Sequence, residues 1–167
     1  MKKRNPSLNQ RQRTLFLCRA AVIAAIYVTL TMICAAFGLS SGVIQVRISE
    51  MLCVLPVFTT AAIPGLAIGC LISNLLASAI WQDIVFGTLA TLIGAYGAYL
   101  LRNVKYLSPL PTVLANAIII PFVLAYGYGA EEGIPFLMLT VGIGEIISAY
   151  VLGIILLQTL KKRNLFS

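Results

Sequence analysis

The sequence predicts an all-α integral membrane protein with six transmembrane helices and both termini in the cytoplasm. Three observations lead to this prediction. Of 167 residues, 60% are hydrophobic and only 10% are charged, and a mean hydropathy of +0.98 leaves too little polar surface to cover a soluble globule. Apolar windows of about 20 residues, the length of a spanning helix, follow one another along the chain. Most basic residues gather near the two chain ends.

The charge pattern divides the chain into a basic cytoplasmic arm (1–19), a six-helix membrane domain (20–160) and a basic cytoplasmic tail (161–167). The first apolar run, Ala20–Gly38, is too long for the hydrophobic region of a typical secretory signal and is not followed by a clear cleavage pattern. We therefore expect a retained first helix. Residues 39–49 then alternate between apolar and polar side chains after a Gly-Ser-rich start, which favours an extended loop or a short hairpin.

An uncharged stretch from Met51 to Gln82 is too long for one spanning helix. At 1.5 Å per residue it would reach roughly 48 Å, against a hydrocarbon core of ~30 Å. The Pro64-Gly65 pair provides the break. The prediction is helix 2 over Glu50–Thr60, short for a full span, and helix 3 over Pro64–Ala79.

Helices 4, 5 and 6 are predicted over Ile84–Leu101, Leu110–Tyr128 and Pro135–Leu160. With the N-terminus inside, eleven of the twelve basic residues lie on the inner side, and Arg47 is the exception. This distribution fits the positive-inside rule. The acids all fall in outer loops or in the outer halves of helices: Glu50, Asp83, Glu131, Glu132 and Glu145. The segment around Arg47 is therefore expected at the extracellular side.

Glu145 is the acid that most needs an explanation, because it lies about ten residues into the last helix. An intramembrane carboxylate costs on the order of 2.5 to 3.5 kcal/mol near a helix centre. Such a residue usually faces the bundle and has a partner. Gly142 and Gly144 leave room beside it, and Ser148 shares its helix face. Glu145 either contacts a ligand or makes a structural hydrogen bond to a neighbouring helix.

The other candidate site residues each have two interpretations. Arg47 and Glu50 pair with each other if this segment is helical, and turn to different partners if it is extended. Asp83 is either an N-cap of helix 4 or part of the site. Asn74 and Asn116 lie inside helices, where an amide serves as a link between helices or as part of a pocket.

Two surface features of the helices suggest contacts. Helix 1 carries overlapping pairs of small residues, Ala20 with Ala24 and Ala21 with Ala25, which permit close approach of another helix. Tyr126 and Tyr128, near the outer end of helix 5, either stack on a flat ligand or pack against neighbours.

The sequence favours neither an enzyme nor a metal protein. It contains no Walker A loop and no histidine, and its four cysteines are widely spaced without a CxxC pair. The net charge of +7 comes mostly from the ends of a hydrophobic chain, so membrane topology explains it better than nucleic-acid binding. We expect no cofactor.

Several motifs occur in an order that resembles the QueT family of queuosine-precursor transporters. They are Val46-Arg47-Ile48-Ser49-Glu50 followed by Leu55-Pro56, then Ala62-Ile63-Pro64-Gly65-Leu66 with Gly69-Cys70 and Asn74-Leu75, then Asp83-Ile84-Val85-Phe86-Gly87-Thr88-Leu89-Ala90, and Gly142-Ile143-Gly144-Glu145. Members of this family are substrate-binding S-components of energy-coupling factor (ECF) transporters. The resemblance extends from helix 1 through helix 6.

The resemblance implies a multi-pass protein of the cell membrane with an S-component-like bundle and a site near the outer face, closed by the loop between helices 1 and 2. Besides membrane lipid, it implies a transmembrane coupling subunit and two cytoplasmic ATPase subunits as partners, with the alanine pairs of helix 1 as the docking surface. ATP hydrolysis would then belong to the partners. An S-component for another vitamin, such as a flavin or biotin, and a structural membrane subunit without transport activity are the alternatives.

The implied ligand is a 7-deazaguanine, such as 7-aminomethyl-7-deazaguanine, its nitrile precursor or queuine. A guanine-like edge presents an N1–H and an amino group side by side, which a carboxylate can accept together. We expect Glu145 or Glu50 to hold this edge, and Arg47 or Asn116 to reach the carbonyl oxygen or orient a carboxylate. Asp83 would meet a charged substituent, and Asn74 is a further candidate.

Overall fold

The computed structural model describes residues 6–38 and 46–163, with side chains from residue 9 onward. Six helical segments follow one another in this part of the chain. They are α1 (Pro6–Ala36), the 3-10 helix η1 (Ile48–Val57), α2 (Ala62–Leu76), α3 (Trp81–Leu100) with short 3-10 turns after it, α4 (Leu110–Phe122) with the π-helix η4 (Val123–Gly127), and α5 (Ile134–Glu145), which continues through the π-helix η5 (Ile146–Val151) into α6 (Leu152–Lys162).

Four of these segments are long and apolar enough to cross a membrane: Asn9–Ala36, Trp81–Asn103, Lys105–Gly127 and Ile134–Lys162. Helices η1 and α2 are shorter apolar helices, and their ten and fifteen residues give lengths of only ~20 and ~22 Å. A ~30 Å core needs more. The described part of the chain therefore confirms the all-helical class and the six helices, is consistent with a membrane protein, and supports complete spans for four of the helices.

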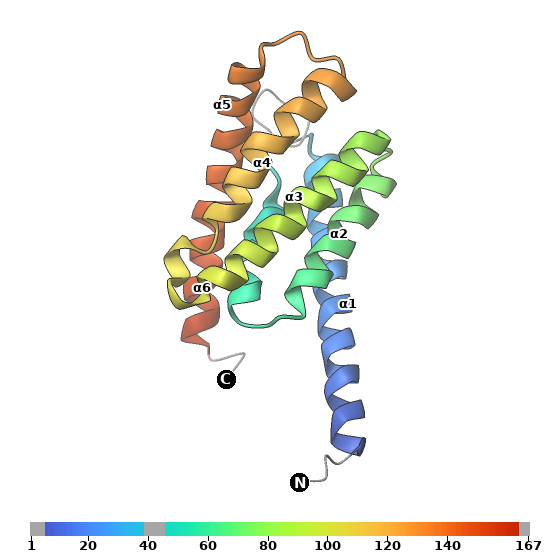
Figure 1. Ribbon diagram of the computed structural model, residues 1–167, viewed down its shortest axis with the longest axis vertical. Coiled ribbons are helices and arrows are strands. Elements are labelled where there is room, and N and C mark those ends of the chain that lie inside the picture. The colour runs from blue at the N-terminus through green and yellow to red at the C-terminus, as the bar shows by residue number, and fades with distance from the viewer. Residues whose placement is uncertain (1–5, 39–45, 164–167) are drawn as a thin grey trace.

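Helix α1 differs most from its predicted boundaries. It begins at Pro6, so much of the predicted basic arm is helical and continuous with the first apolar run. Its 31 residues reach ~46 Å, and its N-terminal part projects from the bundle (Figure 1). Residues 1–5, 164–167 and 39–45, which include most of the predicted loop or hairpin, lie outside the described residues.

Helix η1 runs through the centre of the bundle (Figure 1) and packs against α1, α3, η5 and α6. Its apolar residues are shared between two groups of buried side chains. Leu52 and Leu55 join the group around Tyr27 and Leu66, whereas Cys53 and Val54 belong to the group that includes Val113, Ala149 and Leu157. A short 3-10 helix has few internal hydrogen bonds of good geometry, so this packing on several sides holds it in place.

The start of α1 and the end of α6 lie at the same end of the molecule (Figure 1). The basic residues of α1, of the segment after α3 and of the end of α6 belong to this end as well. The described basic residues there are Arg11, Arg13, Arg19, Arg102, Lys105, Lys161, Lys162 and Arg163. Arg102 lies 4.3 Å from the centre of the Tyr99 ring, an amphipathic arrangement typical of a membrane interface.

Helices α1 and α2 approach each other closely through small residues. Ala20 and Ala24 are buried on α1, and Gly65 and Gly69 face them from α2. A Cβ atom added at Gly65 would lie 2.8 Å from the Ala20 carbonyl oxygen, and one added at Gly69 would lie 2.8 Å from Tyr27 Cβ. The small-residue pattern of helix 1 is therefore used within the chain on this face.

We predict that Gly65→Ala lowers the thermal stability of the protein, because the methyl group would force α1 and α2 apart. The loss should be about 1 to 3 kcal/mol, as for other overpacked interiors. Thermal unfolding of the purified protein in detergent measures the effect.

Gly142→Ala is the matched control, because a Cβ atom there meets only Ala117 Cβ at 3.8 Å, an ordinary contact. Alanine is the better helix former, so this variant should be at least as stable as the original protein. Equal stability of the two variants would contradict the close approach.

Candidate functional site

Four charged side chains converge inside the bundle, and we call them the polar cluster: Arg47, Glu50, Asp83 and Glu145. They come from the segment before η1, from η1, from α3 and from α5. The three acids are only 2%, 6% and 7% exposed, in that order, and Arg47 is partly buried. Charges this deeply buried need partners, because desolvation is costly. The sequence analysis singled out all four residues.

Arg47 lies in extended backbone, with φ −112° and ψ 97°. Its guanidinium is 4.0 Å from Asp83 Oδ2, and its backbone N–H donates to Ser148 Oγ at 3.1 Å. Among the described residues its ion pair is with Asp83, so the exclusive pairing of Arg47 with Glu50 is not observed. The ion pair with Asp83 and the hydrogen bond to Ser148 fix the start of η1 to other helices. Arg47 also interacts electrostatically with Glu50 and Glu145.

Glu50 is held by a residue that the sequence analysis missed. The hydroxyl of Tyr27 on α1 donates a hydrogen bond of 2.5 Å to Glu50 Oε1, and Tyr27 is only 1% exposed. The hydroxyl groups of Thr31 and Ser49 lie 2.9 Å apart beside this contact. A tyrosine in the middle of an apolar helix was the available signal, because a buried phenol needs a hydrogen-bond partner.

Asp83 lies in the first turn of α3, but it does not cap the helix. The N-cap is Ile80, and no side-chain capping bond is present there. Instead, the hydroxyl of Tyr128 donates to Asp83 Oδ2 at 3.1 Å, and Asn74 Nδ2 donates to the Asp83 backbone carbonyl at 3.2 Å. Burial and the neighbouring Asp83 carboxylate raise the pKa of Tyr128, so this phenol remains a donor at neutral pH.

Glu145 is the last residue of α5, directly before the π-helix η5. The side chain of Asn116, on α4, is a polar neighbour of its carboxylate. π-helical turns inside α-helices are rare overall, and those that do occur often lie at functional sites. Ser148, which receives the Arg47 backbone N–H, lies within η5. The last helix thus carries both an acid of the polar cluster and the anchor for the segment that begins η1.

Two carboxylate oxygens of the polar cluster, Asp83 Oδ1 and Glu145 Oε2, are buried without a hydrogen-bond partner among the described residues. Buried polar atoms normally have one. Both are acceptors, and Arg47, which is 4.0 Å from Asp83 Oδ2 and interacts electrostatically with Glu145, provides donors in the same cluster. This combination suits a ligand with several N–H groups and a carbonyl oxygen. In the described part of the chain, no group of three His, Cys, Asp or Glu side chains is placed to hold a metal ion.

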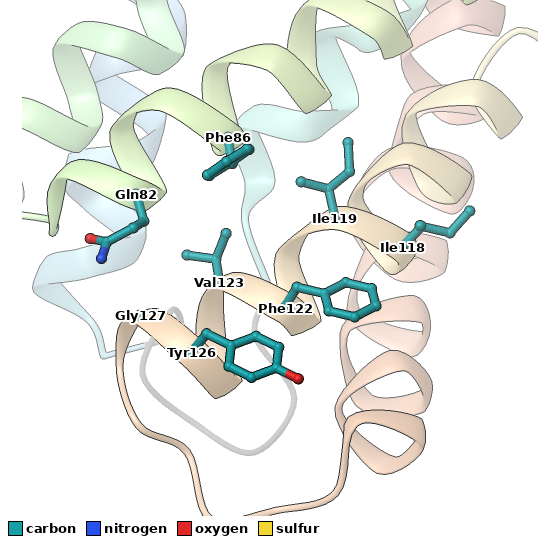
Figure 2. Close-up of a pocket in the computed structure, with 8 residues that line it drawn as sticks. All are labelled: Gln82, Phe86, Ile118, Ile119, Phe122, Val123, Tyr126 and Gly127. Carbon is teal, nitrogen blue, oxygen red and sulfur yellow. The ribbon is translucent and has the colours of Figure 1, made fainter.

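An apolar pocket of about 410 Å³ lies between α3 and the end of α4 (Figure 2). Phe86, Phe122 and Tyr126 line it together with aliphatic side chains, and these three are 41%, 43% and 78% exposed. Gln82, next to Asp83 in the chain, also lines the pocket, but no member of the polar cluster does. Because both helices are apolar spans, we assign this pocket to the lipid-facing surface.

The two tyrosines near the end of α4 and the two alanine pairs of α1 have different surroundings in the structure. Tyr126 stacks on Phe122, with ring centres 6.4 Å apart, whereas Tyr128 binds Asp83. On α1, Ala20 and Ala24 are buried against α2, and Ala21 and Ala25 are exposed. Only the second alanine pair is open to another protein.

Comparison with known proteins agrees with the motifs. A family model described as "QueT transporter" matches residues 17–162. The Queuosine precursor transporter QueT of Lactococcus lactis subsp. cremoris (strain MG1363) is 40% identical over 84 residues, which are 50% of this chain and 49% of that protein. The alignment thus spans about half the length of this curated relative. No solved structure matches the chain. Because the family model covers most of the chain, including every member of the polar cluster, the protein belongs to the QueT transporter family.

Proposed function

We propose that the protein is the substrate-binding S-component of an ECF-type, ATP-driven importer for a queuosine precursor. The observation that carries the proposal is the pair of buried, unpartnered acceptors, Asp83 Oδ1 and Glu145 Oε2, beside the Arg47 guanidinium. The name of the Lactococcus relative supports the substrate class. The site would capture a 7-deazaguanine at the extracellular side of the cell membrane and deliver it inward.

In this proposal, Glu145 receives the guanine-like edge of the ligand. A carboxylate has about four acceptor positions on its two oxygens, so Glu145 can keep its contact with Asn116 and still accept from the ring N1–H and the amino group. Arg47 has five N–H donors, more than its ion pair with Asp83 uses, and reaches the ligand carbonyl. Glu50, held by Tyr27, is the second carboxylate against the ring.

The partners follow from the same proposal. The chain has no Walker A motif, so two cytoplasmic ATPase subunits would hydrolyse ATP. A transmembrane coupling subunit would transmit the resulting conformational change to this protein. The end of the bundle where α1 begins and α6 ends carries most of the described basic residues and would face the cytoplasm, in agreement with the positive-inside rule. Ala21 and Ala25 are exposed on α1 and would admit a helix of the coupling subunit closely.

Glu145→Gln and Glu50→Gln should each weaken the binding of 7-aminomethyl-7-deazaguanine by at least about tenfold. A hydrogen bond to a charged group contributes ~1.5 to 3 kcal/mol, and glutamine keeps the size while losing the charge. Isothermal titration calorimetry on the purified protein measures the affinity.

Glu131→Gln is the matched control, because Glu131 is exposed in the loop before α5, and it should leave binding unchanged. Unchanged affinity in both site variants would rule out these assignments. Mass spectrometry of the small molecule retained by the protein tests the function itself: a flavin or biotin in place of a deazapurine would favour another type of S-component.

Tyr27→Phe should weaken ligand binding by roughly threefold to tenfold, the effect of losing about 1 kcal/mol. The variant keeps the ring in the core but removes the donor to Glu50 Oε1, so this carboxylate is less well oriented. Titration calorimetry of Tyr27→Phe and of Tyr126→Phe, whose ring is exposed at the surface, separates this effect from the general loss of a hydroxyl. Equal binding by both variants would show that Tyr27 does not orient the site.

Ala21→Leu combined with Ala25→Leu should reduce the amount of coupling subunit that copurifies with the protein by at least about half, because leucine prevents close helix approach. Ligand binding to the isolated protein should not change. Ala35→Leu, at an exposed position of the same helix, serves as the control. Undiminished copurification of the double variant would place the docking surface elsewhere.

A further inference from the structure

An apolar groove lies along α3 where this helix packs against α2 and α4. It is separate from the pocket of Figure 2, and no member of the polar cluster lines it. Its volume is about 520 Å³, and it is lined by Ile63, Leu92, Ile93, Tyr96, Gly97, Leu100 and Pro111. A Cβ atom at Gly97 would collide with Pro111. The groove therefore follows a close contact between two helices.

The groove occupies the half of α3 that is nearer to its C-terminal end. Its lining residues on α3 run from Leu92 to Leu100, which corresponds to ~12 Å along the helix axis. The apolar span continues to Asn103. Figure 1 shows that α3 ends near the end of α6, and Lys161 of α6 lies 6.0 Å from the centre of the Tyr106 ring. The groove thus leads toward the end of the bundle that carries most of the described basic residues.

Arg102 lies just beyond the end of this groove. Its guanidinium carbon is 4.3 Å from the centre of the Tyr99 ring, and that ring is 6.5 Å from the ring of Tyr96, which lines the groove. Stacking uses the flat face of a guanidinium and leaves the N–H donors at its edge. Arg102 is exposed, and within the described residues its guanidinium makes no hydrogen bond or ion pair. The donors of a positioned cation are therefore open to a ligand.

The charges around Arg102 favour an anionic ligand. The sequence has no Asp or Glu between residues 84 and 130, and the half-buried Lys105 adds a second positive charge three residues later. A guanidinium binds a phosphate group through two parallel hydrogen bonds. Basic residues at the cytoplasmic side of membrane helices attract anionic lipid headgroups. An apolar groove within a span that ends at such a cation matches both parts of a phospholipid, its acyl chain and its phosphate.

We propose that this groove and Arg102 form a binding site for an anionic phospholipid of the inner leaflet. An acyl chain lies in the groove beside Ile93 and Tyr96, and the phosphate accepts hydrogen bonds from Arg102. The groove contributes affinity for any phospholipid, whereas the positive charge selects an anionic headgroup. This site takes a different ligand from the polar cluster, and the inference does not depend on the proposed transport function.

The test compares two lipids with identical acyl chains and different headgroup charge, phosphatidylglycerol and phosphatidylcholine. Native mass spectrometry of the purified full-length protein, titrated with each lipid in detergent, measures the affinities. The original protein should bind phosphatidylglycerol at least about fivefold more tightly, the effect of one basic residue near an anionic headgroup. In Arg102→Gln the preference should fall to about twofold or less. Ile93→Trp fills the groove and should weaken both lipids together.

Arg11→Gln is the matched control, because Arg11 is an exposed basic residue of α1 that does not line the groove. It should keep the full preference. A loss as large as in Arg102→Gln would show a general effect of surface charge and overturn the site. Equal binding of the two lipids by the original protein would overturn the charge selection, and this comparison does not depend on whether a variant folds.

Two further outcomes would assign Arg102 to another ligand. Displacement of phosphatidylglycerol by soluble glycerol phosphate at a similar concentration would show an anion site that does not use the groove. If Arg102→Gln lowers copurification of the coupling subunit but keeps the full lipid preference, Arg102 contacts an acidic protein surface, and the lipid site is overturned.

Discussion

The ion pair between Arg47 and Asp83 connects the segment before η1 to the start of α3, and the arrangement of the polar interior depends on it. Without Asp83, the guanidinium would lose its ion pair and lie among apolar helices, with Glu50 and Glu145 as its remaining electrostatic partners. Without Arg47, three carboxylates would be buried together. Each charge is therefore tolerated only because the others are present, as expected where removing one partner leaves the other unpaired.

The contacts around this ion pair link distant parts of the chain. The backbone N–H of Arg47 binds Ser148 in η5, Glu50 binds Tyr27 in α1, and Asp83 binds Tyr128 after η4. Helix η1 begins among these contacts and continues into the apolar centre of the bundle. The polar contacts fix where η1 starts, and apolar packing fixes the rest of it. The polar cluster and the apolar core are consequently connected through the same ten-residue helix.

The sequence predicted the class and order of the helices because hydrophobic segments and proline breaks are local features. It also identified Arg47, Glu50, Asp83 and Glu145, because a charge in an apolar chain is conspicuous. It did not reveal which charge pairs with which. The partner of Arg47 is 36 residues away at Asp83, and the partner of Glu50 is an uncharged tyrosine 23 residues before it. Such pairings depend on how helices are arranged in space, which no local pattern encodes.

The two alanine pairs of α1 illustrate the same limit in a simpler form. Ala20 and Ala24 look identical to Ala21 and Ala25 in the sequence, yet a rotation of about 100° separates neighbouring positions on a helix. The first pair therefore meets Gly65 and Gly69 of α2, and the second faces outward. A small-residue pattern indicates only that another helix can approach closely. Once α2 occupies one face, a second protein has access only to the other, so packing inside the chain determines which alanines remain for a partner.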